Sequence, residues 1–492
     1  MLREKDEILE TNINDIVKKI KTSQINATDL TTYFIERIER IDSKINSVIT
    51  IEKEQSLKRA EEINSIIKNN KELSKFPLLG IPIIIKDNIS TKNLRTTAAS
   101  KILSNYTPTF NATVITNLIN AGAIIIGKAN MDEFAMGSSN ENSAFGPVKN
   151  PWDFKKVPGG SSGGPAASVA SGLCIGSLGS DTGGSIRQPA ALCGIVGLKP
   201  TYGLVSRFGL IAFGSSLDQI GPMTKSVEDC AEILEVIAGY DKADSTSSKS
   251  EIPKYTKEIN KGIKGMKIGI IENLLGEGIE KGVSSSVNES ISILKDLGAT
   301  VSKTTIPLLE QAVSIYYLIA PSEASSNLAR YDGFKYGFSN KSSKNIWETM
   351  EFTRGEGFGD EVKRRILIGT YALSSGYYDA YYKKAQQVRT LLTESIIDKF
   401  KEYDALISPT SPCVAFDLKS KVNNPLAMYL NDICTIPANI AGVPAISIPC
   451  KFSDNLPVGL QIMGPHFSES KIMNIGNSIQ KISNWHKEKP RI

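Results

Sequence analysis

Two serines in glycine-rich turns are the first residues that could do chemistry. Ser161 lies within the run GGSSGG, and Ser185 follows two glycines in GSDTGGSIRQP. Glycine permits backbone angles that other residues avoid, so such turns can direct several backbone N–H groups towards one point. The amides around Thr182, Gly183 and Gly184 could therefore form an oxyanion hole beside Ser185. This arrangement predicts nucleophilic attack on a carbonyl carbon.

A serine nucleophile needs a base, and the chain offers little histidine for that role. Its two histidines, His466 and His486, both lie near the C-terminus, and His486 is in a charged tail. Lys86 ends the apolar run LLGIPIII. A lysine held at the edge of a core loses hydration, which lowers its pKa and lets the neutral amine accept a proton. The alternative, a strand-end lysine that reaches into solvent, stays open at this point.

Two other motifs match known patterns but lack their context. Residues 122–128 fit the start of a phosphate-binding loop, yet Ala129 stands where Ser or Thr would bind Mg²⁺, and AIII is typical of a strand. Residues 159–163 fit the G-x-S-x-G nucleophile elbow, with His466 downstream. An elbow follows directly on a buried strand, whereas a loop with proline and charged residues precedes this one. We expect neither a nucleotide site nor a Ser-His hydrolase.

The elements that must position these residues begin with two buried strands. LLGIPIII leads into Lys86, and the β-branched run within 121–130 follows a helical stretch near 112–120. Short apolar runs of this kind are typical of strands buried on both faces. Lys86 is therefore expected at the end of a core strand.

The second half of the chain continues the alternation of strands and helices. Residues 267–307 contain a strand, a helix near 284–297 and a second strand, which predict a βαβ unit. Residues 443–450 and 458–464 are expected to be late core strands. The polar segment 244–262 is expected to be a surface loop. Strands alternating with helices along the chain favour an α/β layered fold.

The N-terminal part, in contrast, is expected to be helical. Thr28 can cap a helix with an apolar stripe over 30–41, and 52–68 is a second helix. We therefore divide the chain into an N-terminal helical segment, 1–70, that packs on a domain of residues 71–492.

Composition narrows the class of protein. The 492 residues are 41% hydrophobic and 22% charged, with a formal net charge of +5, which is ordinary for a globular enzyme. The sequence has no block of consecutive basic residues, so we do not expect this chain to recognise RNA by itself. There is no apolar leader and no apolar run of about 18 residues, so we expect a soluble cytoplasmic protein with no membrane association. The cysteines show no metal-type spacing and are expected to be free, mostly buried thiols, at Cys174, Cys193, Cys230, Cys413, Cys434 and Cys450.

The two serine turns and the lysine together resemble a known signature. GGSSGG, followed at the observed spacing by GSDTGGSIRQPAALCGIVGLKPTYG, resembles the signature of the amidase family, as does the lysine of IPIIIKDN. Further segments, among them MDEFAMGSSNENSAFGPVKNPWD and NDICTIPANIAGVPAISIP, are similar to the branch that hydrolyses glutamine for tRNA-dependent amidation. The resemblance covers most of residues 70–480. Pro165, where serine is common, is a departure outside the catalytic positions.

The resemblance implies a fold and a set of roles. The fold would be an α/β/α layered structure around a large mixed β-sheet, with N-terminal helices. Ser185 would be the acyl-ester nucleophile, Ser161 the bridging residue after a cis peptide bond, and Lys86 the base. The amides of Thr182, Gly183 and Gly184 would supply the oxyanion hole. Arg365 would hold the α-carboxylate of glutamine, Asp432 would hold its α-ammonium group, and Tyr316 would line the pocket.

The resemblance also implies partners. Ammonia would pass to a complex with amidotransferase subunits B and C, which convert Glu-tRNA(Gln), in some organisms also Asp-tRNA(Asn), with ATP and Mg²⁺ on the partner. This chain itself would hold no metal and no cofactor. Two alternatives stay open: a stand-alone amidase for another small amide, and a catalytically silent scaffold subunit.

Overall fold

The computed structural model describes residues 7–69 and 72–492. Residues 1–6, on which the expectation about a leader partly rests, lie outside the described residues. Within the described part, one mixed sheet of eleven strands forms the centre of the molecule, in the order β1-β3-β2-β4-β6-β5-β10-β11-β9-β7-β8. The strands are β1 (Val48–Ile51), β2 (Pro82–Lys86), β3 (Ile124–Ala129), β4 (Gly176–Asp181), β5 (Val196–Lys199), β6 (Gln219–Thr224), β7 (Lys267–Ile271), β8 (Thr300–Thr304), β9 (Ala405–Pro409), β10 (Ala445–Ser453) and β11 (Leu456–Met463).

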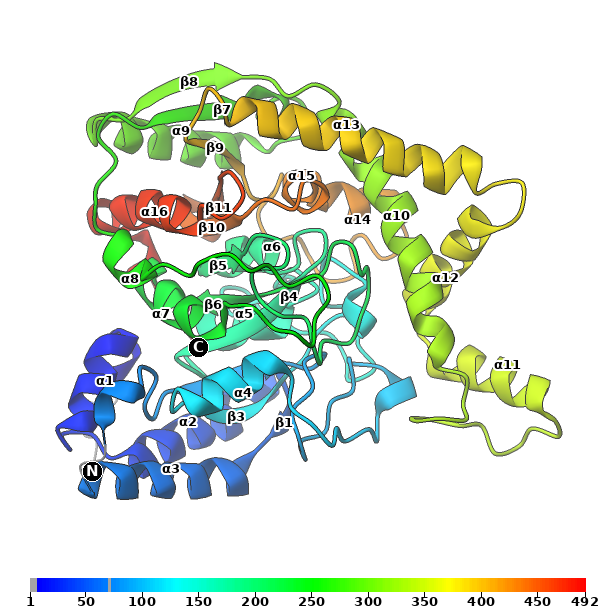
Figure 1. Ribbon diagram of the computed structural model, residues 1–492, viewed down its shortest axis with the longest axis horizontal. Helices are drawn as coiled ribbons and strands as arrows, with labels where there is room; N and C mark the ends of the chain where they lie inside the picture. Colours follow the sequence, from blue (N-terminus) through cyan, green and yellow to red (C-terminus); the bar gives the residue numbers. More distant parts are fainter. Residues whose placement is uncertain (1–6, 70–71) are drawn as a thin grey trace.

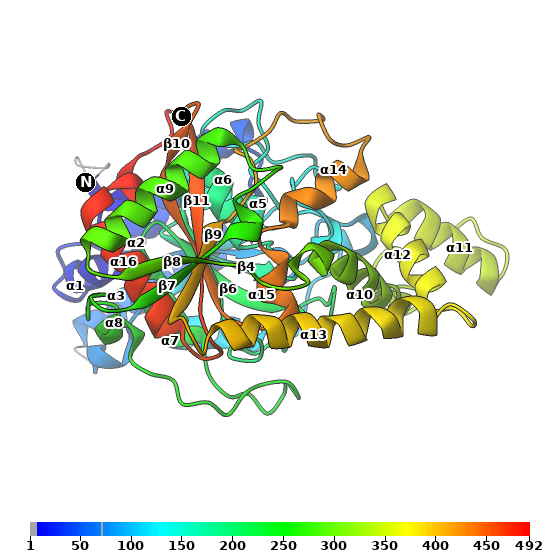
Figure 2. The same cartoon turned by 90° about the horizontal axis from the view of Figure 1, so that it is seen from above.

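Helices lie on both faces of this sheet, as Figures 1 and 2 show, with α9 and α16 on one side of the strands and α14 and α15 on the other. The predicted α/β fold around a mixed sheet is therefore confirmed. The helices are α1 (Ile13–Lys21), α2 (Ala27–Ile41), α3 (Lys53–Lys68), α4 (Thr113–Asn120), α5 (Gly163–Ala170), α6 (Arg187–Cys193), α7 (Val227–Ile237), α8 (Tyr255–Glu258), α9 (Lys281–Asp296), α10 (Ala312–Asn327), α11 (Ile346–Gly357), α12 (Asp360–Leu373), α13 (Lys384–Lys399), α14 (Pro425–Tyr429), α15 (Ile436–Ile440) and α16 (Glu469–Ser483).

The strands that position the candidate chemistry pair in the centre of one half of the sheet. β2 pairs in parallel with β3 and with β4, so it has a neighbour on each side. All five of its residues are buried. β7 and β8 pair in parallel across α9, which confirms the predicted βαβ unit. The two halves of the sheet meet where β5 pairs antiparallel with β10.

The N-terminal segment differs from expectation in two ways. The helix expected behind Thr28 begins at Ala27, and its cap is Asn26, whose side chain accepts the N–H groups of Thr28 and Asp29. Asparagine is among the strongest N-cap residues, and Thr28 is already in the first turn. The segment is also not purely helical, because β1 pairs antiparallel with β3 at the sheet edge. The division into 1–70 and 71–492 stays a prediction.

The polar segment 244–262 is only partly a surface loop. It contains α8, in which Tyr255 is 1% exposed. The backbone N–H of Thr256 donates to Glu235 Oε1 at 2.7 Å, which anchors α8 on α7. Burial of the Tyr255 ring stabilises this segment even though most of the neighbouring residues in the sequence are polar.

Helices α11 and α12 form an arm beside α10 and extend away from the sheet (Figures 1 and 2). Large apolar side chains are exposed on this arm. The exposed fraction is 75% for Trp347 and 70% for Leu367, and Ile346 and Tyr371 are each more than half exposed. Such a concentration is unusual on a monomer's surface and is typical of a protein contact site.

Three further sequence expectations can be compared with the described residues. The cysteines are free, and all are buried except Cys413, which is half-buried, so that prediction is confirmed. Among residues 7–69 and 72–492, no helix combines the length and the apolar character needed to cross a bilayer. Nor does this part of the chain hold a cluster of three or more side chains suited to a metal ion.

Candidate active site

Lys86 lies at the end of β2, fully buried, and does not reach into solvent. Its Nζ donates to Ser161 Oγ at 2.8 Å, to Ser180 Oγ at 3.0 Å and to the Ser180 carbonyl at 3.3 Å. β4 carries Ser180, so the parallel pairing of β2 with β4 fixes this contact. Ser180 has no counterpart in the sequence-based prediction. Ser180 belongs to the GSDTGG run, but its contact with Lys86 could be predicted only by knowing that β2 pairs with β4.

Burial lowers the pKa of Lys86 to about 7, although the carboxylates of Asp132, Asp181 and Asp218 oppose this shift. Removal from water disfavours the charged ammonium group, and the three anions restore part of the loss. A lysine with this pKa is neutral in a large fraction of molecules near pH 7. Lys86 can therefore act as a proton acceptor, as a base requires.

Ser161 lies in a glycine-rich turn that is tied to the turn of Ser185. The peptide bond between Gly160 and Ser161 is cis, as the resemblance implies. The Ser162 N–H donates to the Ser185 carbonyl at 3.1 Å, which ties the two turns together. A side chain on Gly160 would collide with Asp132, so the turn requires glycine there.

Ser185 is buried except for 8% of its surface. Within the described part of the chain, no hydrogen bond engages its hydroxyl group, and none joins it to Ser161. The hydroxyl is thus free to turn towards Ser161 or towards a ligand. Hydrogen bonds of catalytic groups often tighten only when substrate is bound.

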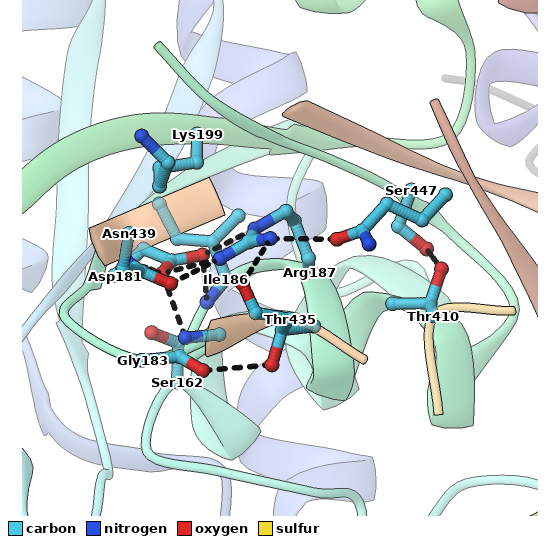
Figure 3. Close-up of polar contacts among 12 residues, drawn as sticks. Ser162, Asp181, Gly183, Ile186, Arg187, Lys199, Thr410, Thr435, Asn439 and Ser447 are labelled. Atoms are coloured by element: carbon cyan, nitrogen blue, oxygen red, sulfur yellow. Dashed lines mark hydrogen bonds and ion pairs between the residues drawn. The ribbon is translucent and has the colours of Figure 1, made fainter. Parts of the chain in front are cut away.

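A buried ion pair holds the turn that carries Ser185 (Figure 3). Asp181 Oδ1 accepts the Gly184 N–H at 2.8 Å, and Oδ2 accepts the Ile186 N–H at 3.2 Å. Arg187 Nε donates to Asp181 Oδ2 at 3.0 Å. The carboxylate therefore grips the backbone on both sides of the serine. The Gly184 amide, one of the three predicted oxyanion donors, thus already has an acceptor in this structure.

Thr435, on the segment before α15, braces the same turn from the other side (Figure 3). Its Oγ1 donates to the Gly183 carbonyl at 2.7 Å, and its carbonyl accepts from Arg187 Nη1 at 3.0 Å. Gly184 has a φ of 132°, and any side chain there would collide with Thr435. Sequence reasoning missed Asp181, Arg187 and Thr435. The acid and base that flank Ser185 in SDTGGSIR were a usable signal, whereas Thr435 is too far along the chain to have given one.

The three residues expected to bind the head group of a substrate come from α10, α12 and the turn after α14. Tyr316 touches the turn of the nucleophile, because a side chain on Gly183 would meet its ring. Arg365 is 2% exposed, and its Nε donates to Glu361 Oε1 at 2.8 Å. Asp432 Oδ2 accepts from Ser138 Oγ at 2.5 Å. The fold thus brings together residues that are far apart in the sequence.

Burial raises the pKa of Asp432 to about 7, against the opposing effects of the Ser138 hydrogen bond and the positive charge of Arg365. A cationic group placed beside this carboxyl would favour its ionised form. A cavity of about 400 Å³ opens beside Arg365 and is lined also by Ser139, Glu361 and Tyr429. Its size suits a small polar molecule.

Comparisons with known proteins agree with this geometry. The family model described as amidase matches residues 29–473. The chain is 54% identical over 480 residues to the glutamyl-tRNA(Gln) amidotransferase A subunit of Thermoanaerobacter pseudethanolicus, covering 98% of each protein. It is 53% identical over 487 residues to the protein of the same name from Listeria innocua, covering 99% of this chain and all of that protein.

Solved structures give the same result. The glutamyl-tRNA(Gln) amidotransferase A subunit of Thermotoga maritima superposes with a TM-score of 0.78 at 45% identity, covering 93% of this chain and 92% of that one. The peptide amidase of Stenotrophomonas maltophilia superposes with a TM-score of 0.84 at 29% identity, covering 98% of both chains. A buried lysine bonded to one serine beside a second, in this fold and with these relatives, leaves one assignment: the chain belongs to the amidase signature family.

Proposed function

We propose that this chain is the glutamine-hydrolysing component of a tRNA-dependent amidotransferase, and that it releases ammonia through a Ser-Ser-Lys triad. The observation that carries the proposal is the 2.8 Å hydrogen bond from buried Lys86 to Ser161, in the turn that is tied to Ser185. The relatives from Thermoanaerobacter and Listeria, which match over nearly their whole length, bear the name of such a component.

The reaction starts when neutral Lys86 takes a proton from Ser185 through Ser161. The Ser185 Oγ attacks the side-chain amide carbon of glutamine, and the amides of Thr182 and Gly183 bind the oxyanion that forms. Lys86 returns the proton through Ser161 to the departing nitrogen, and ammonia leaves a glutamyl ester on Ser185. Water attacks the ester by the same proton path, which releases glutamate and restores the free serine.

The substrate is recognised by its charged head group. Arg365 binds the α-carboxylate and Asp432 the α-ammonium group, while Tyr316 forms the wall next to the reacting amide. The raised pKa of Asp432 fits this role, since the positive charge of an ammonium group beside the carboxyl would favour its ionised form.

The ammonia is used elsewhere in the complex. Subunits B and C would form the complex with this chain, and ATP and Mg²⁺ would be used on the partner to activate Glu-tRNA(Gln), in some organisms also Asp-tRNA(Asn). The exposed apolar arm of α11 and α12 is the surface that we assign to a permanent partner. No cofactor has a role in the steps that this chain performs.

Dependence on partners follows from this division of labour. Hydrolysis without an acceptor would waste glutamine, so we expect the isolated chain to turn over glutamine slowly. Adding the partner subunits, ATP and glutamyl-tRNA should raise the rate at least about tenfold, or about 1.4 kcal/mol of barrier. Ammonia release, measured with each component omitted in turn, tests this. Full activity of the chain alone would point to a stand-alone amidase.

Arg365→Ala separates the proposed function from a stand-alone amidase that acts on another small amide. Loss of the partner of a buried charge should cost about 2–5 kcal/mol, or about thirty- to several-thousand-fold in kcat/KM for glutamine. Lys363→Ala, which removes a half-exposed cation from the same helix, is the matched control and should leave glutamine use unchanged. Steady-state kinetics and melting curves on both variants give the answer. An unchanged kcat/KM in Arg365→Ala would place substrate recognition elsewhere.

The third candidate, a silent scaffold protein, conflicts with the presence of Lys86, Ser161 and Ser185 at one buried site. Mass spectrometry after brief exposure to glutamine distinguishes the two, because only a catalytic chain gains a glutamyl ester on Ser185.

A further inference from the structure

Three side chains behind Arg365 and Asp432 join these two residues into one connected set. They are Tyr317 on α10, Glu361 on α12 and Tyr429 at the end of α14, and we call them the head-group frame. The sequence analysis named Tyr316, the residue before Tyr317, but no member of the head-group frame.

On the cationic side, Glu361 is the common partner. Its Oε1 accepts from Arg365 Nε at 2.8 Å and from the Tyr429 hydroxyl at 3.0 Å. The guanidinium carbon of Arg365 lies 5.3 Å from the centre of the Tyr317 ring and 5.4 Å from that of Tyr429. These are cation–π distances, so the two rings hold the guanidinium group in place together with the carboxylate of Glu361.

On the anionic side, Tyr317 is the link. Its hydroxyl donates to Asp432 Oδ2 at 3.3 Å, and its ring stacks on Tyr429 with centroids 3.8 Å apart and an angle of 20° between the planes. The same tyrosine therefore touches the anion through its hydroxyl and the cation through its ring. A shift of either charged group would disturb the stack.

The frame also decides which polar atoms stay free. Glu361 engages Arg365 through Nε, and within the described part of the chain Nη1 and Nη2 donate to no other group. Ser138 and Tyr317 both engage Oδ2 of Asp432, and Oδ1 has no partner in the same residues. Two parallel N–H donors suit a carboxylate, and a free carboxylate oxygen suits an ammonium group.

We propose that Tyr317, Glu361 and Tyr429 are positioning residues that fix the separation and orientation of Arg365 and Asp432, and so select amides that carry an α-amino-acid head group. This inference rests on the proposed function, because it takes glutamine as the substrate. The two tyrosines act on different ends of the head group: Tyr317 on the ammonium side, and Tyr429, through Glu361, on the carboxylate side.

Tyr317→Phe and Tyr429→Phe test this, since each removes one hydroxyl and keeps the ring. The chain, in complex with its partner subunits, is assayed for the KM and kcat of glutamine. It is also assayed for competitive inhibition by glutaramate, which lacks the ammonium group, and by 4-aminobutanamide, which lacks the carboxylate. Tyr403→Phe, which loses a hydrogen bond to Ser302 near the edge of the sheet, is the matched control. Labelling of Ser185 by a small alkyl fluorophosphonate reports on the nucleophile without a head group.

We expect Tyr317→Phe to raise the KM for glutamine about tenfold, with kcat within about threefold, because a hydrogen bond to a charged group is lost. The same variant should weaken 4-aminobutanamide and spare glutaramate, whereas Tyr429→Phe should do the reverse. Fluorophosphonate labelling should match wild type in both.

Equal weakening of all three ligands, or an unchanged KM, would overturn the frame while leaving glutamine as the substrate. A wild-type complex that binds glutamine no better than the two analogues would overturn the proposed function together with the frame.

Discussion

Replacing Ser185 with alanine is expected to lower glutamine hydrolysis by on the order of 10⁴- to 10⁶-fold. The Ser185 hydroxyl is the only group proposed to form the ester, so its removal should abolish the covalent step. Amidation of tRNA supplied with free ammonia should continue in the complex, because activation of the glutamyl group takes place on the partner. Ammonia release and amidated tRNA are measured side by side on the same preparation.

Ser177→Ala is the matched control for this variant. Ser177 lies in β4, the strand that leads towards Ser185, and its Oγ donates to the Ile84 carbonyl at 2.7 Å. It should keep near-normal glutamine hydrolysis, which separates loss of the nucleophile from a disturbance of the strand. Near-normal glutaminase activity in Ser185→Ala would show that another residue is the nucleophile.

Lys86→Arg is expected to be as damaging as Lys86→Ala, with a loss of about 10²- to 10⁴-fold in kcat. Arginine keeps the positive charge but stays protonated at every ordinary pH, so it cannot accept the proton of Ser185. Measurement of kcat for both variants against wild type checks this. Substantial turnover by Lys86→Arg would mean that the residue serves as a fixed charge.

The pH dependence of glutamine hydrolysis by the wild-type chain also tests whether Lys86 acts as a base. Burial lowers the pKa of Lys86 to about 7 and raises that of Asp432 to about 7. Below this pH Lys86 holds a proton and cannot act as a base, and Asp432 is neutral and cannot bind an ammonium group. The kcat/KM for glutamine should therefore fall as the pH decreases through about 7, by up to about two decades per pH unit where both groups titrate. The rate at which the fluorophosphonate labels Ser185 depends on Lys86 alone of the two groups. It should therefore fall by up to about one decade per pH unit below about 7.

The residues near the chemistry were predictable because they lie in short, dense patterns. Lys86 ends a short apolar, β-branched run, and that pattern predicted its place at the end of a core strand. Ser161 and Ser185 follow glycine pairs, whose backbone freedom marks a functional turn. Arg365 and Asp432 were different, since only the resemblance to the amidase family pointed to them.

Features that depend on contacts between distant segments could not be predicted in this way. Tyr317 is distinguished by its contacts with Arg365, Tyr429 and Asp432, all of which lie far along the chain. β1 could be recognised as a strand only from its pairing with β3. At Thr28 the error was local: two capping residues compete within three positions, and Asn26 takes the role because it precedes the first turn.

The order of the strands has a consequence for how substitutions act on the site. Lys86, Ser161 and Ser185 lie in the first half of the chain, whereas Arg365 and Asp432 lie in the second, and the two halves of the sheet are joined where β5 pairs with β10. The residues of the proposed proton path and nucleophile thus lie in one continuous stretch of sequence. The two stretches still depend on each other, because Thr435 of the second braces the turn that carries Ser185, and Ser138 of the first donates to Asp432. Substitutions that aim to change the substrate must therefore leave Thr435 in place.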